Sequence, residues 1–258
     1  MASKETLLQR LDEIGEMLGT KGGVLALMGV GSVGVETDRI DEYSDLDFFV
    51  IVSPGYRQRF IDQLDWLEDV HPLAYHFKNS DAGHKILFED GIYGEFAVFD
   101  EKQLETAGYA GARIVWRDPA FDREEIPQSN GSFPRLKAGS VDHAIGEAVT
   151  NLYVGLGRYL RGEKFTANLF VHGYALGQLT KVIHVVEPEV DYFPDPYGND
   201  RRLERRYPEF AKRIGHMIQG YDRVPESAIA ILNFLEEHFP INKRMSAEIR
   251  RLAAQSRS

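Results

Sequence analysis

Hydrophobic residues follow two different rhythms in the first half of this chain. Over residues 3–19 they recur every three or four positions, which predicts an amphipathic helix that ends at Gly19. Two short apolar runs follow, over 24–28 and 45–52, and both are typical of strands. The second run ends in FFVIV, which is apolar enough to predict a strand buried in the middle of a sheet.

The alternation of helical and extended patterns continues to about residue 118. A helix is predicted over 56–70 and a strand over 72–77. The apolar runs on either side of Asp90-Gly91 predict a hairpin over 85–100, because Asp-Gly favours a tight turn. A last strand is predicted over 113–118, just before Pro119.

The composition of the chain changes after residue 120. Residues 119–135 are rich in Pro, Ser, Asn and charge, which is typical of a linker. From residue 140 onward the pattern is helical, with predicted helices over 141–160, 165–186, 201–218 and 225–239. The pattern therefore predicts an α/β (α+β) domain with a mixed sheet over 1–120, followed by an all-helical domain over 135–258.

The net charge indicates which partners to expect, and the absence of cysteine excludes some kinds of site. The formal net charge is −10, whereas proteins that bind nucleic acid usually present a basic face. A small or cationic partner is therefore expected, and nucleic acid is not. The chain has no cysteine, which excludes disulfides and thiolate metal sites and suits a cytoplasmic protein. We expect no signal peptide and no membrane span, because no apolar run approaches the roughly 20 residues that a span requires.

Three glycines after the first predicted strand match a dinucleotide-binding fingerprint. Gly29, Gly31 and Gly34 spell G-x-G-x-x-G. That fingerprint requires a full helix at the third glycine and an acidic residue at the end of the second strand. The segment VETDRIDEYSD after Gly34 is too polar and aperiodic for such a helix, and the nearby acidic residues open the second strand. We therefore interpret the glycine match as incidental.

A second interpretation of the same stretch is a phosphate-holding turn beside two metal-binding carboxylates. Glycine allows the backbone at Gly31-Ser32 to approach a phosphate, and exposed N–H groups with a serine hydroxyl can bind its oxygens. Asp45 and Asp47 are two residues apart, so on a strand their side chains share one face. Two such carboxylates form an all-oxygen site that suits Mg²⁺.

Glu95 is the candidate for a third carboxylate at this site. It interrupts a strand whose other residues are apolar, and an acid there is costly unless it is paired or binds a metal. The alternative is that Glu95 faces water on an open face of the sheet. Glu147, in the helical half, is a different kind of candidate: it could act as a general base, as an alternative to Glu95 in that role.

Together these residues resemble the polymerase-β-type nucleotidyltransferase superfamily. The resemblance rests on GS at 31–32, SDLDFFVIV at 44–52 and the strand that contains Glu95. Within the superfamily the chain is similar to the aminoglycoside adenylyltransferases and the lincosamide nucleotidyltransferases, which also have a catalytic α/β domain followed by a helical domain. The resemblance leaves open whether the chain forms a dimer.

The resemblance implies attack by a substrate hydroxyl on the α-phosphate of a nucleoside triphosphate, expected to be ATP, with release of pyrophosphate. It implies two Mg²⁺ ions bridged by Asp45 and Asp47, with Glu95 completing the site and accepting the hydroxyl proton. It assigns phosphate binding to Gly31 and Ser32. The expected acceptor is a small molecule with hydroxyl and amine groups, such as an aminoglycoside or a lincosamide. A protein or tRNA acceptor, or a nucleotide-binding regulator without catalysis, are the alternatives.

One position departs from the family pattern. The turn in the family often reads G-S-x-A-R-G, whereas this chain has GSVGVE, with Val35 in place of the arginine. Either Arg39 or a basic residue of the helical domain replaces that charge, or triphosphate binding is weaker. Lys181 is expected to contact the triphosphate, because an unpaired ammonium among apolar residues is costly; the alternative is that its side chain reaches solvent.

Overall fold

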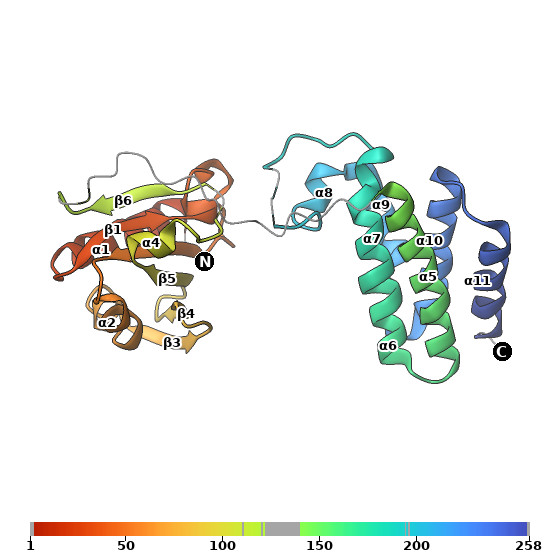
Figure 1. Ribbon diagram of the computed structural model, residues 1–258, viewed down its shortest axis with the longest axis horizontal. Coiled ribbons are helices and arrows are strands. Elements are labelled where there is room, and N and C mark those ends of the chain that lie inside the picture. The colour runs from red at the N-terminus through yellow and green to blue at the C-terminus, as the bar shows by residue number, and fades with distance from the viewer. Residues whose placement is uncertain are drawn as a thin grey trace. The chain divides into compact units, whose positions relative to one another are not determined.

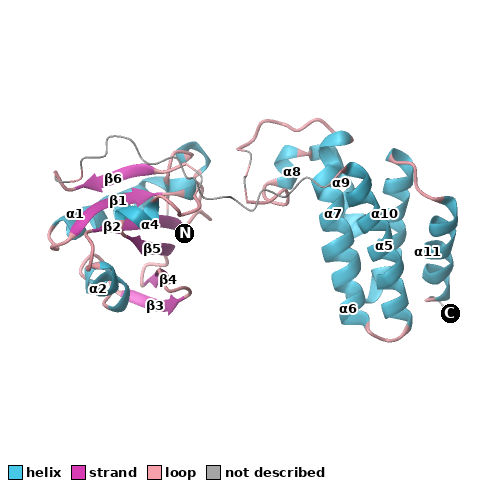
Figure 2. Ribbon diagram, in the orientation of Figure 1, coloured by secondary structure: helices cyan, strands magenta, loops and turns pink. Residues whose placement is uncertain are grey.

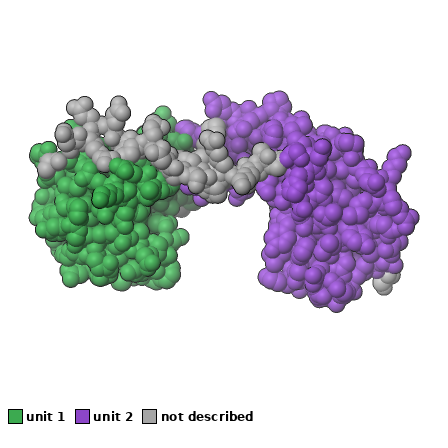
Figure 3. All heavy atoms as spheres, viewed as in Figure 1, with its two compact units in different colours: residues 1–133 green, residues 134–258 purple. Residues whose placement is uncertain are grey.

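The computed structural model describes residues 3–109, 111–119, 121, 140–193, 195 and 197–256. The chain divides into two compact units, residues 1–133 and 134–258 (Figure 3). Of the linker predicted over 119–135, only Pro119 and Phe121 are among the described residues.

A six-stranded sheet forms the centre of the first unit, with the strand order β3-β4-β5-β2-β1-β6 (Figure 2). The strands are β1 (Val24–Gly29), β2 (Leu46–Val52), β3 (Leu73–Lys78), β4 (Gly83–Phe88), β5 (Tyr93–Phe99) and β6 (Arg113–Arg117). Strands β2 and β5 run parallel, and every other neighbouring pair runs antiparallel. The predicted mixed sheet is confirmed, and so is the hairpin around Gly91, whose φ of +87° suits glycine.

Four helices and two 3₁₀ turns are described in the first unit. They are α1 (Lys4–Gly19), η1 (Gly31–Val33), η2 (Thr37–Arg39), α2 (Arg57–Asp62), α3 (Asp65–Glu68) and α4 (Glu101–Leu104). The prediction of one helix over 56–70 was wrong, because the chain is extended at Gln63. The indole of the fully buried Trp66 donates to the Phe60 carbonyl at 3.2 Å, so that carbonyl bonds a side chain instead of the next helical turn.

The two faces of the sheet have different surroundings. The even-numbered residues of β2 pack with α1, α2 and α3 in the larger core of this unit. The odd-numbered residues Phe49 and Ile51 contact a smaller core on the other face, which includes Leu104 of α4 and Tyr109. Asp47 shares this second face, since side chains two apart on a strand point the same way.

The described part of the second unit is helical around the long central helix α5 (Figure 1). Its elements are α5 (Val141–Leu160), α6 (Lys164–Asn168), the π-helix η3 (Leu169–Ala175), α7 (Leu176–Val182), η4 (Ile183–Val185), α8 (Leu203–Arg206), α9 (Pro208–Met217), η5 (Tyr221–Arg223), α10 (Val224–His238) and α11 (Lys243–Gln255). The predicted helical C-terminal region is confirmed. The helix predicted over 201–218 divides at Tyr207, because Pro208 opens a new helix. None of the described helices is long and apolar enough to cross a bilayer.

Candidate active site

A sharp turn follows β1 and lies against the start of β2. Gly31 has a φ of +59°, and a Cβ atom at this position would lie 2.8 Å from Asp47 Oδ2. The Val30 N–H also donates to the Asp47 carbonyl at 2.8 Å. Glycine at position 31 therefore allows the backbone of the turn to touch the Asp47 carboxylate.

The other two glycines of the G-x-G-x-x-G match serve the packing of this same turn. A Cβ at Gly29 would lie 2.5 Å from the Val33 carbonyl oxygen, and one at Gly34 would lie 2.5 Å from the Gly111 carbonyl oxygen. The 3₁₀ turn η1 ends before the third glycine, and the next helical segment after Gly34 is η2, which has three residues. The glycines are thus explained by close backbone packing, in agreement with the rejection of the dinucleotide interpretation.

Ser32 in the turn carries a buried hydroxyl without a hydrogen bond. The residue is 3% exposed, and its Oγ has no hydrogen-bond partner among the described residues. Such a group costs free energy in the folded state, so its presence needs an explanation. A phosphate oxygen at the turn is a suitable acceptor for this hydroxyl.

The two aspartates lie at the start of β2. The strand begins at Leu46, so Asp45 precedes it, whereas the sequence pattern placed Asp45 within the strand. Both aspartates are half-buried. Of the two, Asp47 is tied most directly to the glycine turn, through the contacts of Gly31 and Val30.

Glu95 lies beside Asp47. The two residues are direct partners on the parallel strands β2 and β5, so their side chains share a face. The Glu95 side chain is 43% exposed and makes two contacts: its Oε1 accepts from Asn79 Nδ2 at 2.5 Å, and its Oε2 lies 3.5 Å from Lys85 Nζ. Glu95 therefore lies on a partly open face, as one interpretation expected, and also next to Asp47, as the other required.

Lys85 extends this arrangement to a third strand. It is the direct partner of Glu95 on β4, and the negative charge of Glu95 raises the pKa of Lys85. Lys85, Glu95 and Asp47 thus form one row across β4, β5 and β2. Sequence reasoning missed Lys85 and Asn79, although the predicted hairpin places Lys85 and Glu95 at similar distances from its turn.

The carboxylates at the start of β2 and on β5 are of a kind that suits Mg²⁺, but they are not gathered around one point. Within residues 3–109 and the other described segments, no group of three or more acidic or histidine side chains is close enough to hold a metal ion. Glu95 instead contacts Lys85 and Asn79. The carboxylate oxygens of Asp45, Asp47 and Glu95 are the hard ligands that Mg²⁺ prefers.

Arg113 lies beside the turn and was not predicted from the sequence. It begins β6 opposite Gly29, and its Nε donates to the Val33 carbonyl at 2.9 Å. Arg39, the predicted replacement for the missing arginine, instead pairs with Glu36 at 2.5 Å. Nothing in the spacing of the chain indicates Arg113, because 80 residues separate it from Val33.

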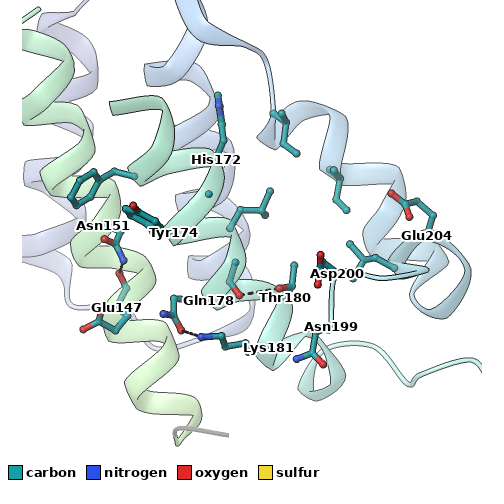
Figure 4. A pocket seen from close by; sticks show the side chains of 17 residues that line it. Glu147, Asn151, His172, Tyr174, Gln178, Thr180, Lys181, Asn199, Asp200 and Glu204 are labelled. Carbon is teal, nitrogen blue, oxygen red and sulfur yellow. Dashed lines mark hydrogen bonds between the residues drawn. The ribbon is translucent and has the colours of Figure 1, made fainter. Parts of the chain in front are cut away.

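Lys181 and Glu147 belong to the second unit and line a cavity of about 840 Å³ there (Figure 4). The Lys181 ammonium donates to Gln178 Oε1 at 3.1 Å. The π-helix η3 contributes His172, which is half-buried; burial lowers the pKa of its imidazole, and its Nδ1 lies 2.7 Å from Asn168 Oδ1. The contact of Lys181 with a triphosphate stays a prediction.

Comparisons with known proteins find similarities among solved structures alone. No protein-family model matches the chain, and a search of curated proteins gives no match. Among solved structures, the chain is similar to an aminoglycoside 6-adenyltransferase from Bacillus subtilis, with a TM-score of 0.39 and 12% identity over 100% of this chain and 99% of that one.

Two further structures are similar at the same level. A CCA-adding enzyme from Thermotoga maritima, in complex with tRNA, has a TM-score of 0.37 and 13% identity over 96% of this chain and 69% of that one. A spectinomycin adenyltransferase from Enterococcus faecialis, with ATP and spectinomycin, has a TM-score of 0.29 and 11% identity over 97% of this chain and 99% of that one. We therefore argue the function of this chain from the residues of its own candidate site.

Proposed function

We propose that the chain is an Mg²⁺-dependent nucleotidyltransferase that transfers AMP from ATP to a hydroxyl of a small cationic molecule. The main support is the juxtaposition at the start of β2. There Asp47 touches the glycine turn and is the direct strand partner of Glu95. A turn for phosphate beside in-register carboxylates is suited to hold a nucleoside triphosphate with its metal.

In the proposed reaction the acceptor hydroxyl oxygen attacks the α-phosphorus and forms a new P–O bond. The bond from the α-phosphorus to the bridging oxygen breaks, and pyrophosphate leaves with the electron pair. Glu95 accepts the hydroxyl proton, and Lys85 and Asn79 hold its carboxylate in place. Glu147 stays the alternative base. Asp45 and Asp47 would hold Mg²⁺, which would supply neutralisation of the charge on the attacking and leaving oxygens.

The cavity of the second unit supports a cationic acceptor. Three carboxylates line it, from Glu147, Asp200 and Glu204 (Figure 4). No ion pair joins any of them to a lysine, arginine or histidine of the described chain. Phe170 and Tyr174 add aromatic surface. Carboxylates and aromatic rings both attract ammonium groups, so an amine-bearing acceptor matches this lining.

The test is label transfer from α-³²P-labelled nucleoside triphosphates with Mg²⁺. The acceptors are a panel of aminoglycosides, lincosamides and other hydroxylated amines, together with tRNA and cell protein. We expect pyrophosphate release and label on one class of small molecule. Label on protein or tRNA would reassign the acceptor. Nucleotide binding without pyrophosphate release from any mixture would contradict transferase activity and favour a regulator.

A further inference from the structure

The face of the sheet that bears Glu95 also carries a group of exposed aromatic side chains. Phe77 is the strand partner of Lys85, which is in turn the partner of Glu95, so all three side chains share one face. Tyr75 and Tyr93 point to this face as well, because each is two residues from a member of that row. Strand β3, which carries Tyr75 and Phe77, forms one edge of the sheet (Figure 1).

The three aromatic rings adjoin one another, and we call them the aromatic shelf. Tyr75 is 55% exposed, Phe77 52% and Tyr93 38%. Leu87 of β4 is the strand partner of both tyrosines and lies between them. Strands lie about 4.8 Å apart and residues two apart on a strand about 7 Å apart, so the shelf measures about 10 Å by 7 Å. Adjoining exposed apolar side chains are typical of a binding surface, whereas single ones are not.

The proposed reaction indicates which molecule lies over this surface. The reacting hydroxyl of the acceptor must come within hydrogen-bond reach of Glu95, which accepts its proton. On the β2 side of Glu95 lies Asp47, where the metal and the triphosphate are proposed to bind. The side towards β4 and β3, which carries the aromatic shelf, is thus the part of this face that is left for the acceptor.

The charge of Lys85 indicates the chemistry of the group that the shelf binds. Lys85 lies between Phe77 and Glu95, and its Nζ is 3.5 Å from Glu95 Oε2. An ammonium group over the shelf would be repelled by Lys85, whereas ring hydroxyls can accept from its other N–H groups. The hydrogens on the flat side of a hydroxylated ring carry a slight positive charge, which suits the negative faces of aromatic rings.

We propose that the aromatic shelf of Tyr75, Phe77 and Tyr93 binds the acceptor through an uncharged hydroxylated ring that carries the reacting hydroxyl. The inference rests on the proposed function, because it presumes that Glu95 accepts the proton of that hydroxyl. It assigns the amines of the acceptor to parts of that molecule away from Lys85. Binding of the nucleotide does not use the shelf.

The experiment measures steady-state kinetics of the full chain with Mg·ATP and the member of the small-molecule panel that takes the label. Tyr75→Thr/Phe77→Thr removes two rings and keeps side chains that suit a strand. It should raise the KM for the acceptor about 10- to 100-fold, the range for two lost ring contacts, and leave the KM for ATP within about twofold.

Two further variants serve as controls. Tyr75→Phe/Phe77→Tyr keeps both rings and should keep the wild-type KM for the acceptor. Tyr56→Thr removes a ring outside the shelf, since Tyr56 is 46% exposed and lies beyond the far end of β2 from Asp47. It should leave the KM values for the acceptor and for ATP unchanged.

The position of the nucleotide on the product tests the argument from charge. Mass spectrometry and NMR of the product should place the nucleotide on a hydroxyl of a ring that carries no ammonium group. A nucleotide on a hydroxyl whose neighbouring ring carbons carry ammonium groups would refute the uncharged ring.

The kinetic outcomes separate the aromatic shelf from the proposed function. If the wild-type chain transfers label and Tyr75→Thr/Phe77→Thr keeps the wild-type KM for the acceptor, the shelf is refuted and the proposed function stands. A raised KM for ATP alone would assign the rings to the nucleotide and also refute the shelf. If the wild-type chain labels no small molecule, the proposed function is refuted and the shelf with it. Should the double variant unfold, Tyr93→Thr on β5 decides by the same two KM values.

Discussion

Ser32 combines a structural cost with a proposed binding role, and the two can be measured separately. Its hydroxyl is buried without a hydrogen bond, so Ser32→Ala should leave the unfolding free energy unchanged or raise it by about 1 kcal/mol. The same variant should bind Mg·ATP about tenfold more weakly, because a phosphate contact is lost. Urea denaturation and calorimetric titration give the two quantities.

Ser227 provides the control for that variant. It is fully buried like Ser32, but its Oγ accepts from the Gln219 N–H at 2.9 Å. Ser227→Ala should therefore lower the unfolding free energy by about 1–3 kcal/mol without changing nucleotide affinity. A Ser32→Ala variant that loses stability and keeps its affinity for ATP would show that the hydroxyl is structural.

Only part of the candidate site could be predicted at the scale of residues. Gly31, Ser32 and Asp47 are close in sequence and belong to one local pattern, a glycine turn followed by an acidic strand start. The structure brings Gly31 and Asp47 into contact. Asn79, Lys85 and Arg113 were missed because their positions depend on strand order and register, which side-chain periodicity does not encode.

At the scale of elements, β4 contains a buried histidine that makes stability depend on pH. His84 is 7% exposed and stacks on Phe96, and in the described part of the chain neither ring nitrogen has a hydrogen-bond partner. Burial lowers the pKa of this imidazole in the folded chain. Below about pH 6.5 the unfolded chain therefore binds more protons than the folded one.

The unfolding free energy should consequently decrease as the pH falls from about 7 to 5. His84→Phe keeps an aromatic ring against Phe96 and should flatten this dependence, whereas His216→Gln, at an exposed position, should preserve it. Denaturant titrations at several pH values provide the measurement. An unchanged slope in His84→Phe would assign the dependence to other groups, such as the half-buried His172.

The hydrophobic pattern of the sequence predicted some helices incorrectly and missed one. The helical periodicity over 56–70 is real, but the buried indole of Trp66 takes the carbonyl that would continue the helix. Over 165–186 the periodicity predicted a helix and gave no sign of its π-helical middle. Helix α11 was not predicted. Its apolar stripe is short, and five of its residues are charged: Lys243, Arg244, Glu248, Arg250 and Arg251.

At the scale of the whole molecule, each unit contains its own hydrophobic core. The core cluster around α5 includes only residues from 144 to 253, and the two clusters of the sheet include only residues from 7 to 121. Residues 134–258 expressed alone should therefore fold into a helical unit with cooperative unfolding. Far-UV circular dichroism with urea denaturation tests this.

The division into two units also predicts which fragment binds the nucleotide. Residues 1–133 contain the turn, both aspartates and Glu95, so this fragment should bind Mg·ATP without the helical unit. The helical fragment serves as the control and should not. A non-cooperative, loosely packed helical fragment would contradict independent folding of that unit.

The central claim is that Asp45 and Asp47 hold the metal for nucleotidyl transfer. The most direct measurement is pyrophosphate release, with and without Mg²⁺, by the wild-type chain and by the Asp45→Asn/Asp47→Asn double variant. We predict Mg²⁺-dependent release by the wild type, a loss of about 1,000-fold or more in the double variant, and equal unfolding midpoints, because asparagine keeps the size of both half-buried side chains. Retained turnover in the double variant would contradict the account.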